Sequence, residues 1–237
     1  MAAPKLPASK LPKASRGVAR TAAPRKRARA VERTRDPERT RGRILEAAKA
    51  EFAAHGLGGA RVDRIAASAD ANKRMLYYYF GNKDALFLAV LEGAYAHIRE
   101  AEKQLRLTEI DPPEAIRRLV AFTWEYYLEH PEFMNLLNSA NLHQGRHLKK
   151  SGRVRTMHSP FVAMIEEVLE RGRKSGVFRA GVDPVQLYIS IAALTYFYLG
   201  NKFTLSEIFG RDLLSPRARA ERLAHMNELV LGFLFKN

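Results

Sequence analysis

Residues 62–86 read VDRIAASADANKRMLYYYFGNKDAL, and this stretch decides the fold. Apolar residues recur at spacings of three and four on both sides of a polar break, which predicts two short helices at 62–69 and 73–80. Asn72 stands directly before the second helix, where its side chain can cap free backbone N–H groups. Two short helices joined by a tight turn are typical of a helix-turn-helix, although any three-helix domain with short connections fits the same periodicity.

A longer helix is predicted on each side of this pair. The Asp-Pro-Glu sequence at 36–38 gives the first one a capping residue, a first-turn proline and an acidic first turn. Gly56 ends that helix by supplying a left-handed C-terminal position, after an apolar stripe formed by Ile44, Ala48 and Phe52. Asn82 caps the later helix, which starts at Lys83 and carries on one face Leu86, Val90, Ala94 and Ile98.

The helix at 73–80 is expected to turn a basic and aromatic face outward. Leu76 and Phe80 are four residues apart and therefore face the core together. The opposite side then carries Lys73, Arg74, Tyr77 and Tyr78. Lysine and arginine bind guanine edges and phosphates, and tyrosine hydroxyls donate to phosphate oxygens. This composition favours a helix that enters the major groove of DNA.

The same residues resemble a known family. The spacing of Leu-Tyr-x-Tyr-Phe-x-Asn-Lys at 76–83 after Ile-Ala at 65–66 is similar to the DNA-binding domain of the TetR (tetracycline-repressor-like) regulators. The resemblance includes the first helix and covers about residues 38–90. It implies a dimeric regulator, in most members a repressor, whose variable helical C-terminal domain binds an inducer.

Carried over by position, the resemblance implies which residues touch DNA. Residues 73–75 fall where members read bases, Tyr77 and Lys83 fall where they bind phosphate, and Tyr79 falls where a side chain often reaches the DNA backbone. The N-terminus of the helix at Asn72 adds backbone N–H donors for phosphate. The expected DNA-binding residues are Arg61, Asn72, Lys73, Arg74, Met75, Tyr77, Tyr79 and Lys83.

The sequence departs from the family pattern at three places. Asp70 replaces the usual turn glycine, which is workable because aspartate tolerates the left-handed conformation better than most residues. Ala60 and Arg61 stand where a serine or threonine pair usually caps the second helix, so Arg61 is expected to supply a phosphate contact instead. Arg64 stands where an acidic residue is usual. The extra arginines are expected to increase phosphate affinity and its salt dependence.

The positive charge lies mostly in the first part of the chain. Residues 1–43 hold 14 Lys and Arg against three acidic residues, a net charge of +11 that leaves only +4 of the total +15 for the rest. Residues 1–35 are expected to form a disordered basic arm, because they cannot bury enough apolar surface to offset the ordering entropy. Such an arm favours a polyanion, while a solubilising tail is the alternative. It has no apolar face for membrane attachment.

Several classes of function are disfavoured. The chain has no cysteine, no glycine-rich phosphate loop and no nucleophile motif, so we expect no catalytic residue, no cofactor, no metal site and no enzyme. The most apolar run, residues 187–199, is shorter than the roughly 20 residues that a membrane span needs. With no secretory signal pattern either, the expected location is the cytoplasm.

Residues 86–237, behind the 36–85 DNA-binding domain, are expected to form a helical domain for ligand binding and dimerisation. Helices are predicted to begin at Asp111-Pro112 and Asp183-Pro184, and another, at 154–174, is one that Pro160 could kink or interrupt. The last two helices, at 185–202 and 216–235, either form a homodimer interface or only close the core of one chain. Their apolar residues are Leu187, Ile191, Leu194, Tyr198, Leu223, Met226, Val230 and Phe233.

A small-molecule effector pocket is expected between the middle helices, although each candidate residue could equally be ordinary core or surface. The candidates are Trp124, Tyr127, Phe133, Asn141, His143, His158 and Phe161. The polar stretch at 141–150 has three readings: a pair of metal ligands formed by His143 and His147, a basic lip over an anionic ligand, or a solvated loop. Gly145 weakens the helix that a metal pair would need.

The sequence therefore predicts an all-α protein with an N-terminal three-helix helix-turn-helix domain. The expected function is a repressor that binds double-stranded DNA at a palindromic operator and leaves it when a small molecule binds. The alternative is an architectural or non-specific DNA-binding protein driven by the basic arm. Deleting residues 1–35 separates the two, because only the second function would lose nearly all DNA affinity.

Overall fold

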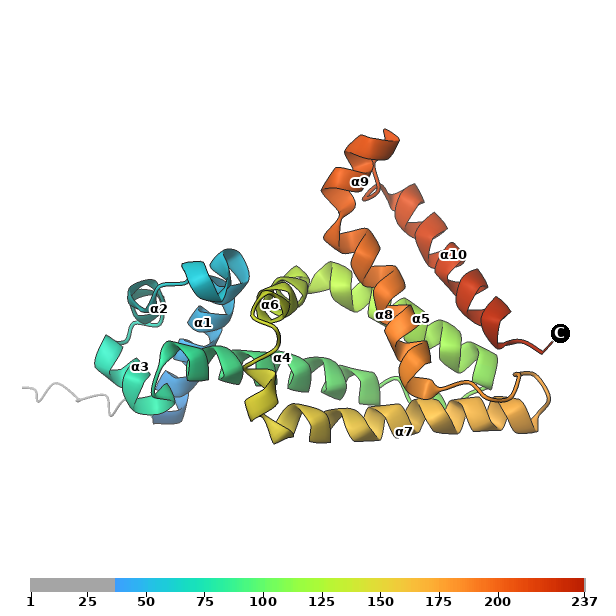
Figure 1. Ribbon diagram of the computed structural model, residues 1–237, viewed down its shortest axis with the longest axis horizontal. Coiled ribbons are helices and arrows are strands. Elements are labelled where there is room, and N and C mark those ends of the chain that lie inside the picture. Colours follow the sequence, from blue (N-terminus) through green and yellow to red (C-terminus); the bar gives the residue numbers. More distant parts are fainter. Residues whose placement is uncertain (1–36, 237) are drawn as a thin grey trace, which may run out of the picture. The chain divides into compact units, whose positions relative to one another are not determined.

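The computed structural model describes residues 37–236, and these residues are helical apart from turns, loops and one isolated bridge between Phe178 and Phe235 (Figure 1). The predicted arm at 1–35 and the predicted cap at Asp36 lie outside the described residues. The elements are α1 (Pro37–Gly59), α2 (Val62–Ser68), α3 (Lys73–Phe80), α4 (Lys83–Lys103), η1 (Leu107–Glu109), α5 (Pro112–Glu129), α6 (Pro131–Leu142), η2 (Leu148–Lys150), α7 (Gly152–Lys174), α8 (Pro184–Gly200), α9 (Lys202–Phe209) and α10 (Pro216–Leu234).

Helices α1 to α3 share one apolar core. The predicted stripe of α1 is fully buried, and it meets Ile65 of α2 together with Leu76 and Phe80 of α3. The backbone of α1 breaks at Gly56, where φ is 62° and ψ is 175°. This break confirms the prediction that the first helix ends at Gly56, and the residues of α1 after it, to Gly59, form a separate short helical turn beyond the kink. Glycine is suited to such a break because it adopts positive φ without steric cost.

The turn between α2 and α3 forms as the sequence predicts. Asp70 adopts a φ of 46°, the left-handed conformation expected where glycine is usual. The side chain of Asn72 accepts a hydrogen bond of 2.8 Å from the N–H of Met75, and Asn82 accepts one of 2.8 Å from Ala85. Both predicted caps are confirmed, and they fix the positions at which α3 and α4 begin.

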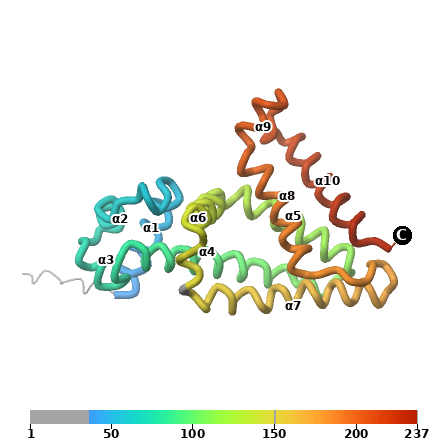
Figure 2. The backbone as a smooth tube through the Cα atoms, viewed as in Figure 1, coloured from blue at the N-terminus to red at the C-terminus, as the bar shows by residue number. Residues whose placement is uncertain are grey.

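Helix α4 packs against α1 at one end and along α7 at the other, as the path of the chain in Figure 2 illustrates. Its predicted apolar face, from Leu86 to Ile98, is buried. Helix α6 packs on α1, and there Ser139 Oγ accepts a hydrogen bond of 2.8 Å from the backbone N–H of Leu57. The helices of the DNA-binding domain are thus in direct contact with those that follow.

Two features of the second half differ from the prediction. Helix α7 runs through Pro160 without interruption, because packing of Phe161 and Ile165 on neighbouring helices outweighs the cost of about 3 kcal/mol for an interior proline. Helix α9 was not predicted, because none of its residues is buried and it therefore carries no apolar stripe that faces a core. Its C-cap residue is Gly210, which adopts the left-handed conformation with a φ of 60°.

Of the eight residues expected at a subunit interface, Phe233 is exposed and Leu194, Tyr198 and Leu223 are half-buried. Four of the eight pack inside the chain and face no partner: Leu187, Ile191, Met226 and Val230. The large apolar side chains that α8 and α10 do expose are Val185, Ile189, Phe197, Leu229 and Phe233. Periodicity missed most of these because α8 is apolar on every side, so its spacing does not identify the inward face. No helix of the described residues is long and apolar enough to cross a membrane.

Candidate nucleic-acid interface

Helix α3 presents the outward face that its spacing predicts. Leu76 and Phe80 are buried, whereas Tyr77 is 46% exposed and Tyr78 is 80% exposed. Lys73 and Arg74 are exposed at the N-terminal end of the helix, and Met75 and Tyr79 are half-buried beside the core. The rings of Tyr78 and Tyr79 meet edge to face with centroids 5.2 Å apart. The solvent-facing side of α3 is therefore cationic and aromatic.

Both lysines among the predicted DNA-binding residues have partners within the protein. Lys73 forms an ion pair with Asp63 of α2, across the turn between the two helices. Lys83, which is half-buried, donates a hydrogen bond of 2.9 Å from Nζ to the carbonyl oxygen of Ala60. An ammonium group has three donors, so Lys83 retains two beyond this bond. A phosphate contact by Lys83 is compatible with its link to the segment before α2.

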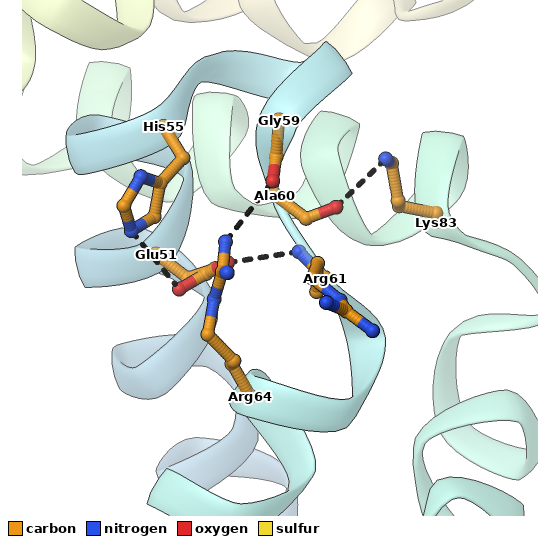
Figure 3. A network of polar contacts seen from close by, with 7 residues as sticks. All are labelled: Glu51, His55, Gly59, Ala60, Arg61, Arg64 and Lys83. Atoms are coloured by element: carbon orange, nitrogen blue, oxygen red, sulfur yellow. Dashed lines mark hydrogen bonds and ion pairs between the residues drawn. The ribbon is translucent and has the colours of Figure 1, made fainter.

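The start of α2 is held by Glu51, a residue of α1 that the sequence pattern did not single out. As Figure 3 shows, its Oε1 atom accepts hydrogen bonds of 2.8 Å from the backbone N–H of Arg61 and 2.7 Å from Arg64 Nε. Arg64 also donates from Nη2 to the carbonyl oxygen of Gly59 at 3.0 Å. The hydrogen bond from the Arg64 side chain, together with the one from the backbone N–H of Arg61, holds the pKa of Glu51 below its ordinary value.

These hydrogen bonds explain how the start of α2 is stabilised although Arg61 and Arg64 depart from the TetR family pattern. Arg61 is the N-cap residue of α2, and its side chain makes no capping hydrogen bond. The carboxylate of Glu51 instead satisfies the backbone N–H of Arg61, and a negative charge at a helix N-terminus is favourable. Arg64 positions that carboxylate. The exposed guanidinium of Arg61 has no ion-pair partner among residues 37–236, so it is free to meet phosphate.

Three of the seven predicted pocket residues, Tyr127, Phe133 and His158, are linked through Tyr95, whose ring meets that of Phe133 at 5.7 Å and that of His158 at 5.2 Å. Trp124 packs edge-on against Tyr198 of α8, with ring centroids 5.5 Å apart, and Tyr127 packs against Phe133 at 5.8 Å. Asn141 is exposed at the end of α6. Phe161 of α7 lies under the guanidinium of Arg99, which forms a buried pair with Glu102 that the sequence pattern did not single out. The positive charge of Arg99 also contributes to lowering the pKa of His158.

The polar stretch at 141–150 folds into turns that lie against α4. His147 is buried, and its Nε2 lies 3.6 Å from Asp84 Oδ2. Its ring meets Phe87 edge to face at 5.3 Å, and burial lowers the pKa of this imidazole. His143 and His147 do approach, with ring centroids 6.0 Å apart. Among the described residues no group of three or more His, Asp or Glu side chains is arranged to hold a metal ion.

Two short helices at a tight turn, with a capped second helix that exposes lysine, arginine and tyrosine, define a helix-turn-helix DNA-binding protein. Residues 44–90 match the family model of bacterial regulatory proteins, tetR family, and residues 112–230 match the model of the tetracyclin repressor-like C-terminal domain. The chain belongs to the TetR family of transcriptional regulators. These are ligand-regulated DNA-binding repressors and not enzymes.

Similar proteins support this assignment along most of the chain. The HTH-type transcriptional repressor NicS of Pseudomonas putida is 42% identical over 84% of this chain and 94% of its own length. The HTH-type transcriptional repressor SCO4008 of Streptomyces coelicolor is 40% identical over 58% of this chain and 69% of its own length. The crystal structure of the transcriptional regulator SCO4942 of Streptomyces coelicolor covers 82% of this chain and 98% of its own, with a TM-score of 0.61 and 25% identity.

Proposed function

We propose that this protein acts in the cytoplasm as a homodimeric repressor that binds a palindromic operator and is released from it by a small-molecule effector. The observation that carries the proposal is the exposed face of α3. Lys73, Arg74 and Tyr77 lie on this face, while the opposite side of the helix is buried. Two such helices in one dimer would enter successive major grooves about one helical turn, roughly 34 Å, or more apart.

The proposed contacts follow from where each side chain lies. Lys73 and Arg74 stand at the N-terminal end of α3, the part of a recognition helix that reaches base edges. Tyr77 and Lys83 would bind phosphates, and Arg61 would add a further phosphate contact at the start of α2. Because Lys73 is paired with Asp63 in the free protein, binding to a base or phosphate would exchange one partner for another.

An exposed apolar surface supports the homodimer. Helices α8 and α10 line a groove of about 760 Å³, and the residues around it include Phe197, Leu229 and Phe233. These three side chains are 62%, 46% and 46% exposed in the single chain. Apolar groups of this size are normally covered, and a second copy of the same two helices would cover them symmetrically.

Footprinting on the promoter region of the protein's own gene tests the proposal at moderate salt. We expect a protected palindrome, and Arg74→Ala should weaken binding by about 1–3 kcal/mol, or roughly 5- to 150-fold. Lys103→Ala, which removes an exposed lysine near the far end of α4, serves as the control and should bind as the wild type does. Absence of any protected palindrome would refute the proposal.

Deleting residues 1–35 decides between this function and non-specific binding through the basic arm. The repressor should keep its palindrome preference and lose only part of its affinity, because the arm supplies charge and α3 supplies specificity. Loss of nearly all binding would favour the alternative.

A further inference from the structure

Helix α4 carries an arginine–glutamate pair in the interior of the C-terminal half. Arg99 Nη2 lies 2.9 Å from Glu102 Oε1, and the two side chains are only 4% and 2% exposed. The same Nη2 donates a hydrogen bond of 3.0 Å to the hydroxyl of Tyr188 on α8. Removing an arginine from water costs several kcal/mol, so a buried guanidinium is expected to have all its donors satisfied.

The donors of Arg99 are not all satisfied. Its Nε and Nη1 atoms are buried and have no hydrogen-bond partner among residues 37–236, and the same is true of Glu102 Oε2. A buried donor that lacks a partner costs about 1–3 kcal/mol, and more when it is charged. Three such atoms in one place indicate that something outside the described residues completes the cluster.

The charge of the cluster favours an anion. Burial raises the pKa of Glu102 to about 8, even though the positive charge of Arg99 opposes this shift. At neutral pH the carboxyl is therefore largely protonated, whereas arginine stays charged at every pH that a protein meets. Arg99 is then a buried cation without a compensating charge.

Aromatic rings surround this cation. The guanidinium carbon of Arg99 lies 4.1 Å from the centre of the Phe161 ring and 5.3 Å from that of Tyr188. On the α7 side, the rings of His158 and Tyr95 meet edge to face at 5.2 Å. Burial lowers the pKa of His158, and the charge of Arg99 lowers it further, which places this imidazole near the same cation in neutral form.

Tyr95 and His158 also line a cavity of about 460 Å³, within the size range of small-molecule sites. The cavity wall includes two basic residues, Lys149 and Arg155, which are exposed. The cavity therefore combines basic residues with an aromatic pair, Tyr95 and His158, and both members of that pair interact electrostatically with Arg99. Positive charge at a cavity raises the local concentration of anions.

The geometry points to an effector site centred on Arg99, and to a small aromatic carboxylic acid as the class of effector. The carboxylate would accept hydrogen bonds from the free Nε and Nη1 donors, the ring would pack among Tyr95, Phe161 and Tyr188, and a donor on the ligand would meet Glu102 Oε2. This inference rests on the proposed function, because it names the ligand class of the proposed effector site.

Calorimetric titration of the full-length protein near pH 7 tests the site with three probes: benzoate, benzamide and acetate. We expect saturable binding of benzoate. Benzamide has the same ring without the charge, and it should bind at least roughly thirtyfold more weakly, because a charge-assisted hydrogen bond in a buried site is worth 2 kcal/mol or more. Acetate carries the charge without the ring and should also bind far more weakly. Equal binding of benzoate and benzamide, or no benzoate binding, would overturn the inference.

A matched pair of double variants locates the site. Arg99→Gln with Glu102→Gln replaces the buried pair by neutral groups and should weaken benzoate binding at least roughly thirtyfold. Glu100→Gln with Lys103→Gln removes an exposed pair with the same spacing on the same helix, and should leave benzoate binding unchanged. Should the buried variant fail to fold, Arg99→Lys keeps the charge but loses the planar fork, and it should still weaken benzoate binding several-fold. Unchanged binding in the folded variant would overturn the site.

The same probes on operator DNA separate failure of this inference from failure of the proposed function. Operator binding without any aromatic acid binding leaves the repressor intact and overturns the Arg99 site. Benzoate binding that depends on Arg99 but does not release DNA supports the anion site and contradicts its role as an effector site.

Discussion

Replacing Glu102 by glutamine should remove a pH dependence of the free energy of unfolding. The side chain is 2% exposed, and burial raises the pKa of its carboxyl from the ordinary 4.5 to about 8. Between these two values the unfolded chain has released the proton while the folded chain still holds it. The unfolded state thus binds fewer protons, so the stability contributed by Glu102 is greatest below pH 4.5 and declines as the pH rises towards 8. The amide in the Glu102→Gln variant cannot titrate, so the variant lacks this decline.

The size of the effect follows from the pKa shift. One pH unit is worth about 1.4 kcal/mol, so a shift from 4.5 to about 8 sets an upper limit of roughly 5 kcal/mol. The titratable groups that interact electrostatically with Glu102 are Arg99, Tyr126, Tyr127 and Tyr188. Arg99 stays charged, and burial raises the pKa of each tyrosine above its ordinary value of 10, so none of them titrates in this window. A measured effect of a few kcal/mol would therefore come from Glu102.

The assay is urea unfolding of wild type and Glu102→Gln from pH 5 to 9, at one protein concentration so that any subunit association contributes equally. The difference in free energy of unfolding should move in favour of the variant with rising pH and level off above pH 8. Glu100→Gln, an exposed neighbour on α4, should show no such trend. A wild-type advantage that is constant or grows with pH would refute the assigned protonation state.

Three further perturbations address the caps, the α1–α6 contact and the subunit surface. Asn72→Ala should lower the free energy of unfolding by about 1 kcal/mol in urea and weaken operator binding in a gel-shift assay, because it removes the cap of α3. Ser139→Ala should cost about 1–3 kcal/mol, since it strands the buried N–H of Leu57, and hydrogen exchange at that amide should accelerate. Phe197→Glu should give monomers in sedimentation equilibrium with unchanged helix content, whereas Leu142→Glu, at an apolar residue of α6 that is 81% exposed, should not.

The elements that the sequence predicts best are those encoded by neighbouring residues. The bounds of α3 follow from Asn72 before it, Gly81 after it and two apolar residues at helical spacing between them. The positive φ of Asp70 is likewise a local property of one residue in a tight turn. Each of these features depends on groups fewer than about ten residues apart, and such groups meet in any fold that contains the helix.

Features that depend on distant parts of the chain were not predictable in the same way. The Arg99–Glu102 pair has the spacing of an ion pair on a solvated helix face, and α4 carries another such pair, Glu100–Lys103, that is in fact exposed. Only the packing of α7 and α8 decides which of the two is buried. Glu51 is comparable, because its partners lie 10 and 13 residues further along a chain that first has to turn.

The expected pocket residues illustrate the limit of composition as a guide. Aromatic side chains at helical spacing pack in cores far more often than they bind ligands, and Trp124 does so against Tyr198. Phenylalanine is also common in cores, and Phe161 differs from a core phenylalanine only because the guanidinium of Arg99 lies above its ring. An unpaired charge is the stronger signal of a site, and the sequence alone does not reveal burial of a charge.

Helix α4 supplies the physical link between the proposed effector site and DNA. Lys83 at its first residue holds the segment before α2 through the carbonyl of Ala60, while Arg99 lies sixteen residues further on, or about 24 Å along the axis. A ligand can shift the DNA-binding equilibrium only by its difference in affinity for the two states. A carboxylate that draws Arg99 away from Glu102 acts directly on α4, whose faces pack on α1 and α7. Because a helix moves largely as a rigid unit, we expect a small rotation at Arg99 to displace Lys83 and, with it, the start of α2.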